Sequence, residues 1–136
     1  MDEQKEVIVL DVSLAKFGSF VYNIHMANSI KYKEQTFNIG DMLDIFYRIK
    51  EGEKERIQKF SGMLIKFRGV NDALRMITAR RITRSGIGVE RIIPLASPFI
   101  SDIKIAKKGR YTKAKAYFVR GLSDQNLRKK IFKHAK

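Results

Sequence analysis

From Phe37 onward the sequence consists of short stretches in which apolar and polar residues alternate, separated by glycine, proline or charged turns. Alternation with a period of two is typical of strands that bury one face. In residues 42–49, for example, Leu43 and Ile45 share one face and Asp44 lies on the other. The pattern predicts a mainly β protein.

The same alternation predicts further strands along the chain. Extended segments are expected at residues 42–49, 54–60, 63–67, 76–84, 89–93, 103–105 and 115–120. A hairpin turn is expected at Gly52, which can take a positive φ, and a loop at residues 68–75. No amphipathic helix separates these segments, so residues 37–121 are predicted to form a small antiparallel barrel or sandwich rather than a parallel α/β sheet.

The two ends of the chain follow different patterns. Residues 1–36 are expected to form an N-terminal extension, with a β-prone stretch at 7–14 and a segment at 20–33 whose spacing is compatible with a helix. Residues 122–136 are expected to form a basic C-terminal tail. In this tail Ser123 can cap a short helix, and the tail could also become ordered only when it binds RNA.

The charge balance is strongly positive. The chain has 28 Lys and Arg against 14 Asp and Glu, a formal net charge of +14. Residues 104–136 contain twelve basic residues and one acidic residue, Asp124. A solvated surface normally mixes both signs to limit self-repulsion, whereas this excess indicates a polyanionic partner, and nucleic acid is the first to consider.

Several other classes of function are disfavoured. The chain has no cysteine, which excludes disulfides and thiolate metal sites and fits a reducing compartment. Its two histidines are His25 and His134, so a histidine-based nucleophile or metal site is not expected. Asp41 and Asp44 would point to opposite faces of a strand, which disfavours a shared metal site, and they are expected to be turn and surface carboxylates. Apolar runs are far shorter than the roughly 20 residues that span a bilayer, and the acidic N-terminus is unlike a secretory or organellar leader. We therefore expect a cytoplasmic protein without cofactor, metal or small-molecule substrate.

Basic residues are interleaved with the apolar residues of the predicted strands. They are Arg68, Arg75, Arg80, Arg81, Arg84 and Arg91 in the middle of the chain, and Lys107, Lys108, Arg110, Lys113, Lys115 and Arg120 near its end. Tyr111, Tyr117 and Phe118 lie among them and could stack on unpaired bases. Alternation puts Tyr117 and Phe118 on opposite faces, so at most one of them is expected in the core.

Four motifs, in this order, resemble those of the bacterial-type large-subunit ribosomal protein nineteen family. They are Phe37-x-x-Gly40-Asp41, EGEKERIQKFSG at 51–62, GIGVERIIPLASP at 86–98 and KKGRYTKAKAYFVR at 107–120. The resemblance implies an SH3-like barrel that binds 23S ribosomal RNA at the intersubunit face, near neighbouring large-subunit proteins and 16S ribosomal RNA. The sequence departs from the family's pattern at residues 69–74, at Thr112 and after Arg120.

The hypothesis from sequence is a structural component of the large ribosomal subunit, bound to the ribosome in the cytoplasm and supporting subunit association. The residues expected to contact RNA are Arg68, Arg80, Arg81, Arg84, Arg91, Lys107, Lys108, Arg110, Lys113, Lys115, Arg120, Lys129 and Lys130. The alternatives are a free translation or transcription factor with a similar small barrel and, more remotely, an RNA-cleaving enzyme that uses Asp41 or Asp44.

Overall fold

The computed structural model describes residues 28–133, and their fold is mainly β. The strands are β1 Ser29–Tyr32, β2 Gln35–Asn38, β3 Met42–Glu51, β4 Lys54–Arg68, β5 Met76–Ile82, β6 Gly88–Pro94 and β7 Ile100–Lys107. Two 3-10 helices, η1 Asp72–Leu74 and η2 Tyr117–Gly121, and the α-helix α2 Asp124–Phe132 complete the described elements. All strand pairs are antiparallel. The prediction of a mainly β, antiparallel fold is confirmed.

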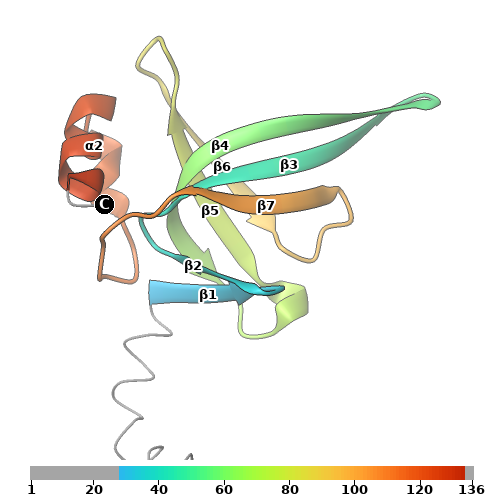
Figure 1. Ribbon diagram of the computed structural model, residues 1–136, viewed down its shortest axis with the longest axis horizontal. Helices are drawn as coiled ribbons and strands as arrows, with labels where there is room; N and C mark the ends of the chain where they lie inside the picture. Colours follow the sequence, from blue (N-terminus) through green and yellow to red (C-terminus); the bar gives the residue numbers. More distant parts are fainter. Residues whose placement is uncertain (1–27, 134–136) are drawn as a thin grey trace, which may run out of the picture.

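The strands form two sheets (Figure 1). β1 and β2 make a two-stranded sheet, and the other five strands make a sheet with the order β6-β5-β4-β3-β7. Consecutive strands from β3 to β6 are neighbours, and β7 returns to pair with β3. In the described part of the chain β6 and β7 are the edge strands of this sheet, and its closure into an SH3-like barrel stays a prediction.

The hairpin of β3 and β4 projects away from the rest of the sheet (Figure 1). Its turn pairs Glu51 with Lys54, and Gly52 has a φ of 65°, as the sequence predicts. The expectation of two separate strands at 54–60 and 63–67 is wrong, because β4 is a single strand of 15 residues. β4 is central in the sheet, and its residues 63–65 are all buried. Ser61 and Gly62, which lie between the two predicted strands, pair with Asp44 and Leu43 of β3 and so continue the strand.

Two further predictions are corrected by the structure. Residues 115–120 do not form a strand, because the chain turns into η2 after the Ala116 N–H donates to the Ile65 carbonyl at 2.8 Å. The turn of η2 directs Val119 into the core. The predicted helical segment at 20–33 ends in strand β1, where Ile30 is buried in the core; its residues 20–27 and the β-prone stretch 7–14 lie outside the described residues.

One hydrophobic core joins the sheets and the C-terminal helix. Ile30 and Phe37 of the small sheet belong to the same buried cluster as Leu127 and Ile131 of α2. The predicted helix after Ser123 is confirmed, and Ser123 is its N-cap residue, although its side chain makes no capping hydrogen bond. The division into residues 1–36, 37–121 and 122–136 stays a prediction, and both flanking parts contribute to this core.

A buried carboxylate ties the start of β3 to the segment that follows β7. Asp41 has an exposed fraction of 0%. Its two oxygens accept the N–H groups of Asn38 and Gly109, each at 2.8 Å. The expectation that Asp41 is a surface carboxylate is therefore wrong. The reason is that backbone donors from two distant segments converge on it, which compensates the loss of water.

No helix within residues 28–133 combines the length and the apolar character that crossing a membrane requires.

Candidate nucleic-acid interface

The residues 108–116, called the basic loop below, carry four cations on a backbone that is fixed at its first residues. The N–H of Gly109 donates to Asp41, and the N–H of Arg110 donates to the carbonyl of Ile131 in α2 at 3.2 Å. These bonds connect the loop both to the turn before β3 and to the C-terminal helix. The loop therefore has a defined path although it contains no regular secondary structure.

The middle and the end of the basic loop are held as well. The Asn28 side chain donates to the Tyr111 carbonyl at 2.8 Å, and the Tyr111 hydroxyl donates to the Lys115 carbonyl at 3.0 Å. The last residue, Ala116, is buried and bonded to Ile65 of β4. A loop held by such bonds presents its side chains at constant spacing, as binding to phosphates requires.

The four cations of the basic loop are exposed to solvent. They are Lys108, Arg110, Lys113 and Lys115. In the part of the chain that the structure describes, none of them forms an ion pair with a carboxylate. Their charge is thus available to an external anion, and their mutual repulsion falls when that anion binds.

The helix α2 and the end of β7 bring three more predicted cations to the same region. Burial of the apolar face of α2 leaves Lys129 and Lys130 exposed. The Lys130 ammonium lies 4.5 Å from the ring centre of Phe118, and the Lys107 ammonium 4.8 Å from that of Phe132. These cation–π contacts orient the side chains and leave their charge in place.

Two of the predicted arginines lie together on the neighbouring strands β5 and β6. Arg81 of β5 and Arg91 of β6 have their guanidinium carbons 5.3 Å and 4.6 Å from the ring centre of Phe60. Arg91 also lies 5.8 Å from the ring of Tyr47. Both arginines are exposed and have no carboxylate partner among the described residues, so they form a second, smaller cationic group on the strands.

Arg80 and Arg120 differ from the other predicted residues because both bind Glu90. Arg80 is opposite Glu90 in the strand register and donates to it at 3.0 Å. Arg120 donates with two nitrogens, at 2.8 Å and 2.9 Å. The hydrogen bond from Arg120 lowers the pKa of Glu90, and the charges of both arginines act in the same direction. These two arginines join η2 to the edge of the sheet and have less free charge for RNA.

Arg68 and Arg84 lie in different places, and Arg84 lines a groove with Arg120 and Arg128. Arg68 ends β4 and is paired with Met76 at the start of β5, whereas Arg84 lies in the turn after Ile82 at the end of β5. The two residues are thus at opposite ends of one strand. Both are exposed, and the Arg68 guanidinium lies 3.6 Å from the sulfur of Met76.

The structure resolves the choice between Tyr117 and Phe118. Phe118 packs against the core and lies 5.3 Å from the ring of Tyr111, whereas Tyr117 is 37% exposed. Tyr117 is flanked by Lys66 of β4, a cation missing from the predicted set, at 5.8 Å. A hydrogen bond with Lys66 lowers the pKa of the Tyr117 phenol. The signal for Lys66 is its place as a single cation in an otherwise apolar run.

Three cations around Tyr32 are not among the residues expected to contact RNA, although Arg75 is one of the basic residues interleaved with the predicted strands. Lys31, Lys33 and Arg75 line a cavity with this tyrosine. The Lys-Tyr-Lys triplet at residues 31–33 is the sequence signal that could have indicated this cavity, but the other residues that line it come from distant segments. Within residues 28–133 no cluster of three or more acidic or histidine side chains could hold a metal ion.

Comparison with known proteins gives consistent matches. The family model described as "Ribosomal protein L19" matches residues 21–131. The "Large ribosomal subunit protein bL19" of Porphyromonas gingivalis is 50% identical over 92 residues, which is 68% of this chain and 74% of that protein. The proteins of the same name from Fusobacterium nucleatum and Thermus thermophilus are 46% and 44% identical, over 68% and 70% of this chain and 78% and 64% of their own lengths.

Proposed function

Because this chain belongs to the ribosomal protein L19 family, whose members are structural proteins of the large ribosomal subunit and not enzymes, we propose that it binds 23S ribosomal RNA. We propose further that it does so at the intersubunit face, where it also contacts 16S ribosomal RNA and neighbouring ribosomal proteins and supports subunit association. Its site of action is the ribosome in the cytoplasm. Membership of the family removes the two alternatives, a free factor and an RNA-cleaving enzyme.

The observation that carries this proposal is the anchored basic loop. Lys108, Arg110, Lys113 and Lys115 are exposed and unpaired among the described residues, and the backbone between them is bonded to β4, α2 and the buried Asp41. Because the backbone of the loop is already ordered, binding a phosphate has to order only the exposed side chains, which lowers its entropic cost. The expected recognition is of backbone phosphates and of RNA shape, with little base readout.

The other predicted cations extend this surface. Lys107, Lys129 and Lys130 lie around the basic loop, and Arg81 and Arg91 add a second group on the strands. The SH3-like barrel is part of the same proposal, and it is supported by the antiparallel order β6-β5-β4-β3-β7 with β7 returning to β3. In this proposal Arg80 and Arg120 mainly position η2 beside the basic surface.

The experiment is a salt titration of binding to a 23S ribosomal RNA fragment. With roughly eight phosphate contacts we expect the logarithm of the association constant to fall against the logarithm of salt concentration with a slope of about −6 to −7. Alanine at Arg110, Lys113 and Lys115 together should reduce the steepness of this slope by roughly 2 to 3. A slope near zero for the wild type would contradict the proposal.

The matched control removes the same number of positive charges from the tip of the β3–β4 hairpin. Lys50, Lys54 and Arg56 are also exposed, and Lys50 and Arg56 pair with glutamates. Alanine at these three positions should leave the slope nearly unchanged. An equal loss in both triple variants would mean that net charge, rather than the basic loop, determines binding.

A further inference from the structure

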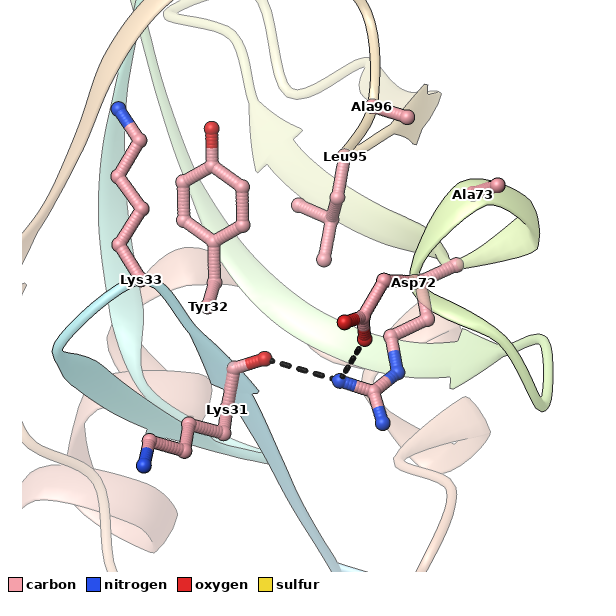
Figure 2. A pocket seen from close by; sticks show the side chains of 8 residues that line it. Lys31, Tyr32, Lys33, Asp72, Ala73, Leu95 and Ala96 are labelled. Carbon is pink, nitrogen blue, oxygen red and sulfur yellow. Dashed lines mark hydrogen bonds and ion pairs between the residues drawn. The ribbon is translucent and has the colours of Figure 1, made fainter.

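We propose that the cavity between β1, η1 and the connection from β6 to β7 is a second RNA site, which takes a single unpaired nucleotide. The cavity has a volume of about 590 Å³, within the range of small-ligand sites. Figure 2 shows this cavity, called the β1–η1 pocket here. The proposal rests on the proposed RNA-binding function, but it uses none of the thirteen residues predicted from the sequence.

The pocket has the charge that a nucleotide phosphate needs. Lys31 and Lys33 are exposed and have no carboxylate partner among the described residues. The Arg75 guanidinium is fixed, because it binds the Asp72 carboxylate at 2.8 Å and the Lys31 carbonyl at 3.2 Å (Figure 2). Asp72 is 91% exposed, so water screens its charge and the cavity remains cationic.

The pocket also has the apolar and aromatic surface that a base needs. Tyr32 is half-buried, and its ring is held by Phe37 at a centroid distance of 6.3 Å. The Lys33 ammonium lies over this ring, 5.3 Å from its centre, and Leu95 lies across the cavity (Figure 2). The proposed contact with the base is made by the face of the ring, and it does not require the hydroxyl.

This combination selects among anionic ligands. Paired bases are stacked inside a duplex and cannot enter a cavity, whereas an unpaired base can leave the stack and lie against an aromatic ring. A bare phosphate would use Lys31, Lys33 and Arg75 but would make no use of the accessible part of the half-buried Tyr32 ring. An unpaired nucleotide uses both parts, because it joins a phosphate to a planar apolar base.

The test uses the full chain and labelled RNA hairpins, with binding measured by fluorescence anisotropy. One hairpin is fully paired, four carry a single bulged A, C, G or U, and one carries an abasic bulge. We expect the wild type to prefer at least one bulged base over the paired hairpin by roughly five-fold or more, as expected for one base on an aromatic ring. The abasic bulge should lose this preference.

Two sets of variants locate the site. Tyr32→Leu should abolish the preference and leave affinity for the paired hairpin unchanged, whereas Tyr32→Phe should retain it. The double change Lys31→Ala and Lys33→Ala should also reduce the preference, and Lys50→Ala with Lys54→Ala, which removes the same charge from exposed positions of the hairpin tip, should not. The lysine variants keep the test valid if Tyr32→Leu fails to fold.

Three outcomes would overturn the pocket proposal. They are the absence of any bulge preference in the wild type, a preference that survives both Tyr32→Leu and the Lys31 and Lys33 changes, and an abasic bulge that binds as well as a bulged base. In each case steep salt dependence with the paired hairpin would still support the basic loop. Loss of that salt dependence would instead contradict the proposed function, so the two failures are distinguishable.

Discussion

The carboxylate of Asp41 accepts the N–H of Gly109 at 2.8 Å, although 68 residues separate them in the sequence. The bond joins the turn before β3 to the basic loop. The second oxygen of the same carboxylate accepts the Asn38 N–H at 2.8 Å. A single buried side chain therefore fixes both the start of the large sheet and the first residues of the candidate RNA surface.

Replacing Asp41 by Asn should destabilise the protein. The amide offers one acceptor oxygen where the carboxylate offers two, so the N–H of Asn38 or of Gly109 loses its partner in a buried place. We expect the free energy of unfolding to fall by about 1.5–3 kcal/mol, the typical range for hydrogen bonds to a charged group. Urea denaturation followed by circular dichroism measures the change.

The control for this substitution is Glu53→Gln, which makes the same chemical change at an exposed residue of the hairpin turn. Its effect should lie within about 0.5 kcal/mol. If Asp41→Asn were as mild as Glu53→Gln, the two backbone bonds would not be what orders the basic loop.

Gly109 should not tolerate a side chain. A Cβ atom at this position would lie 2.1 Å from the carbonyl oxygen of Gly40, so the two backbone segments would have to separate. We expect Gly109→Ala to reduce the free energy of unfolding by about 1–3 kcal/mol. Gly121→Ala is the matched control, because nothing lies within 4 Å of its added carbon. Equal melting temperatures for the two variants would contradict this account.

The helix α2 should be docked on the free protein. Ile131 is 2% exposed and belongs to the common core, so Ile131→Ala should cost about 2–5 kcal/mol by removing buried carbons. It should also increase the mobility of Arg110, because the Arg110 N–H donates to the Ile131 carbonyl. Amide hydrogen exchange of α2 and of the basic loop, measured without RNA, gives the readout.

Lys129→Ala is the control for α2, since this side chain is on the exposed face and its loss removes no buried surface. Protection of α2 from exchange should be the same as in the wild type. Fast exchange of α2 in the wild-type protein would show that the helix forms only when RNA is bound.

The ion pairs of Glu90 should contribute a pH-dependent part of stability. The hydrogen bond from Arg120 holds the pKa of Glu90 below its ordinary value of 4.5 in the folded state. A lowered carboxyl pKa stabilises the fold above pH 4.5, and this contribution is lost as the pH falls through the folded-state pKa. Glu90→Gln should thus be less stable than the wild type by about 0.5–1 kcal/mol at pH 7, a value limited by solvent screening.

Thermal unfolding of both proteins from pH 7 to pH 2 tests this prediction. The difference between the two proteins should shrink as the pH falls below 4.5, because protonation of Glu90 removes its charge. A stability difference that stays constant across this range would show that the glutamate acts through packing and not through its charge.

Much of the fold could be predicted because its signals are local. The alternation in residues 42–49 and the glycine at Gly52 correctly indicated the β3–β4 hairpin, and Ser123 correctly marked the start of α2. The prediction was wrong at residues 115–120, where alternation continues but the chain forms η2. A strand also needs a partner, and residue spacing carries no information about whether a neighbouring strand has a free edge there.

The residues expected to contact RNA stay a prediction, and the structure adds their exposure and their partners. Lys113 and Lys115, which charge and motif order single out, are exposed. The sequence could not indicate that Arg80 and Arg120 converge on Glu90, or that Arg75 meets Lys31 beside Tyr32. The presence of exposed cations follows from composition, whereas the two clusters depend on which distant segments the fold brings together.

By itself, then, the sequence determined the class of fold, the sign of the surface and the family, because periodicity, charge and motif order are properties of the linear chain. Only the tertiary structure decided that Asp41 is buried, which cations remain without an acidic partner among the described residues, and where the β1–η1 pocket lies. Those features arise from contacts between residues far apart in sequence, and their energies depend on burial and distance in the folded state.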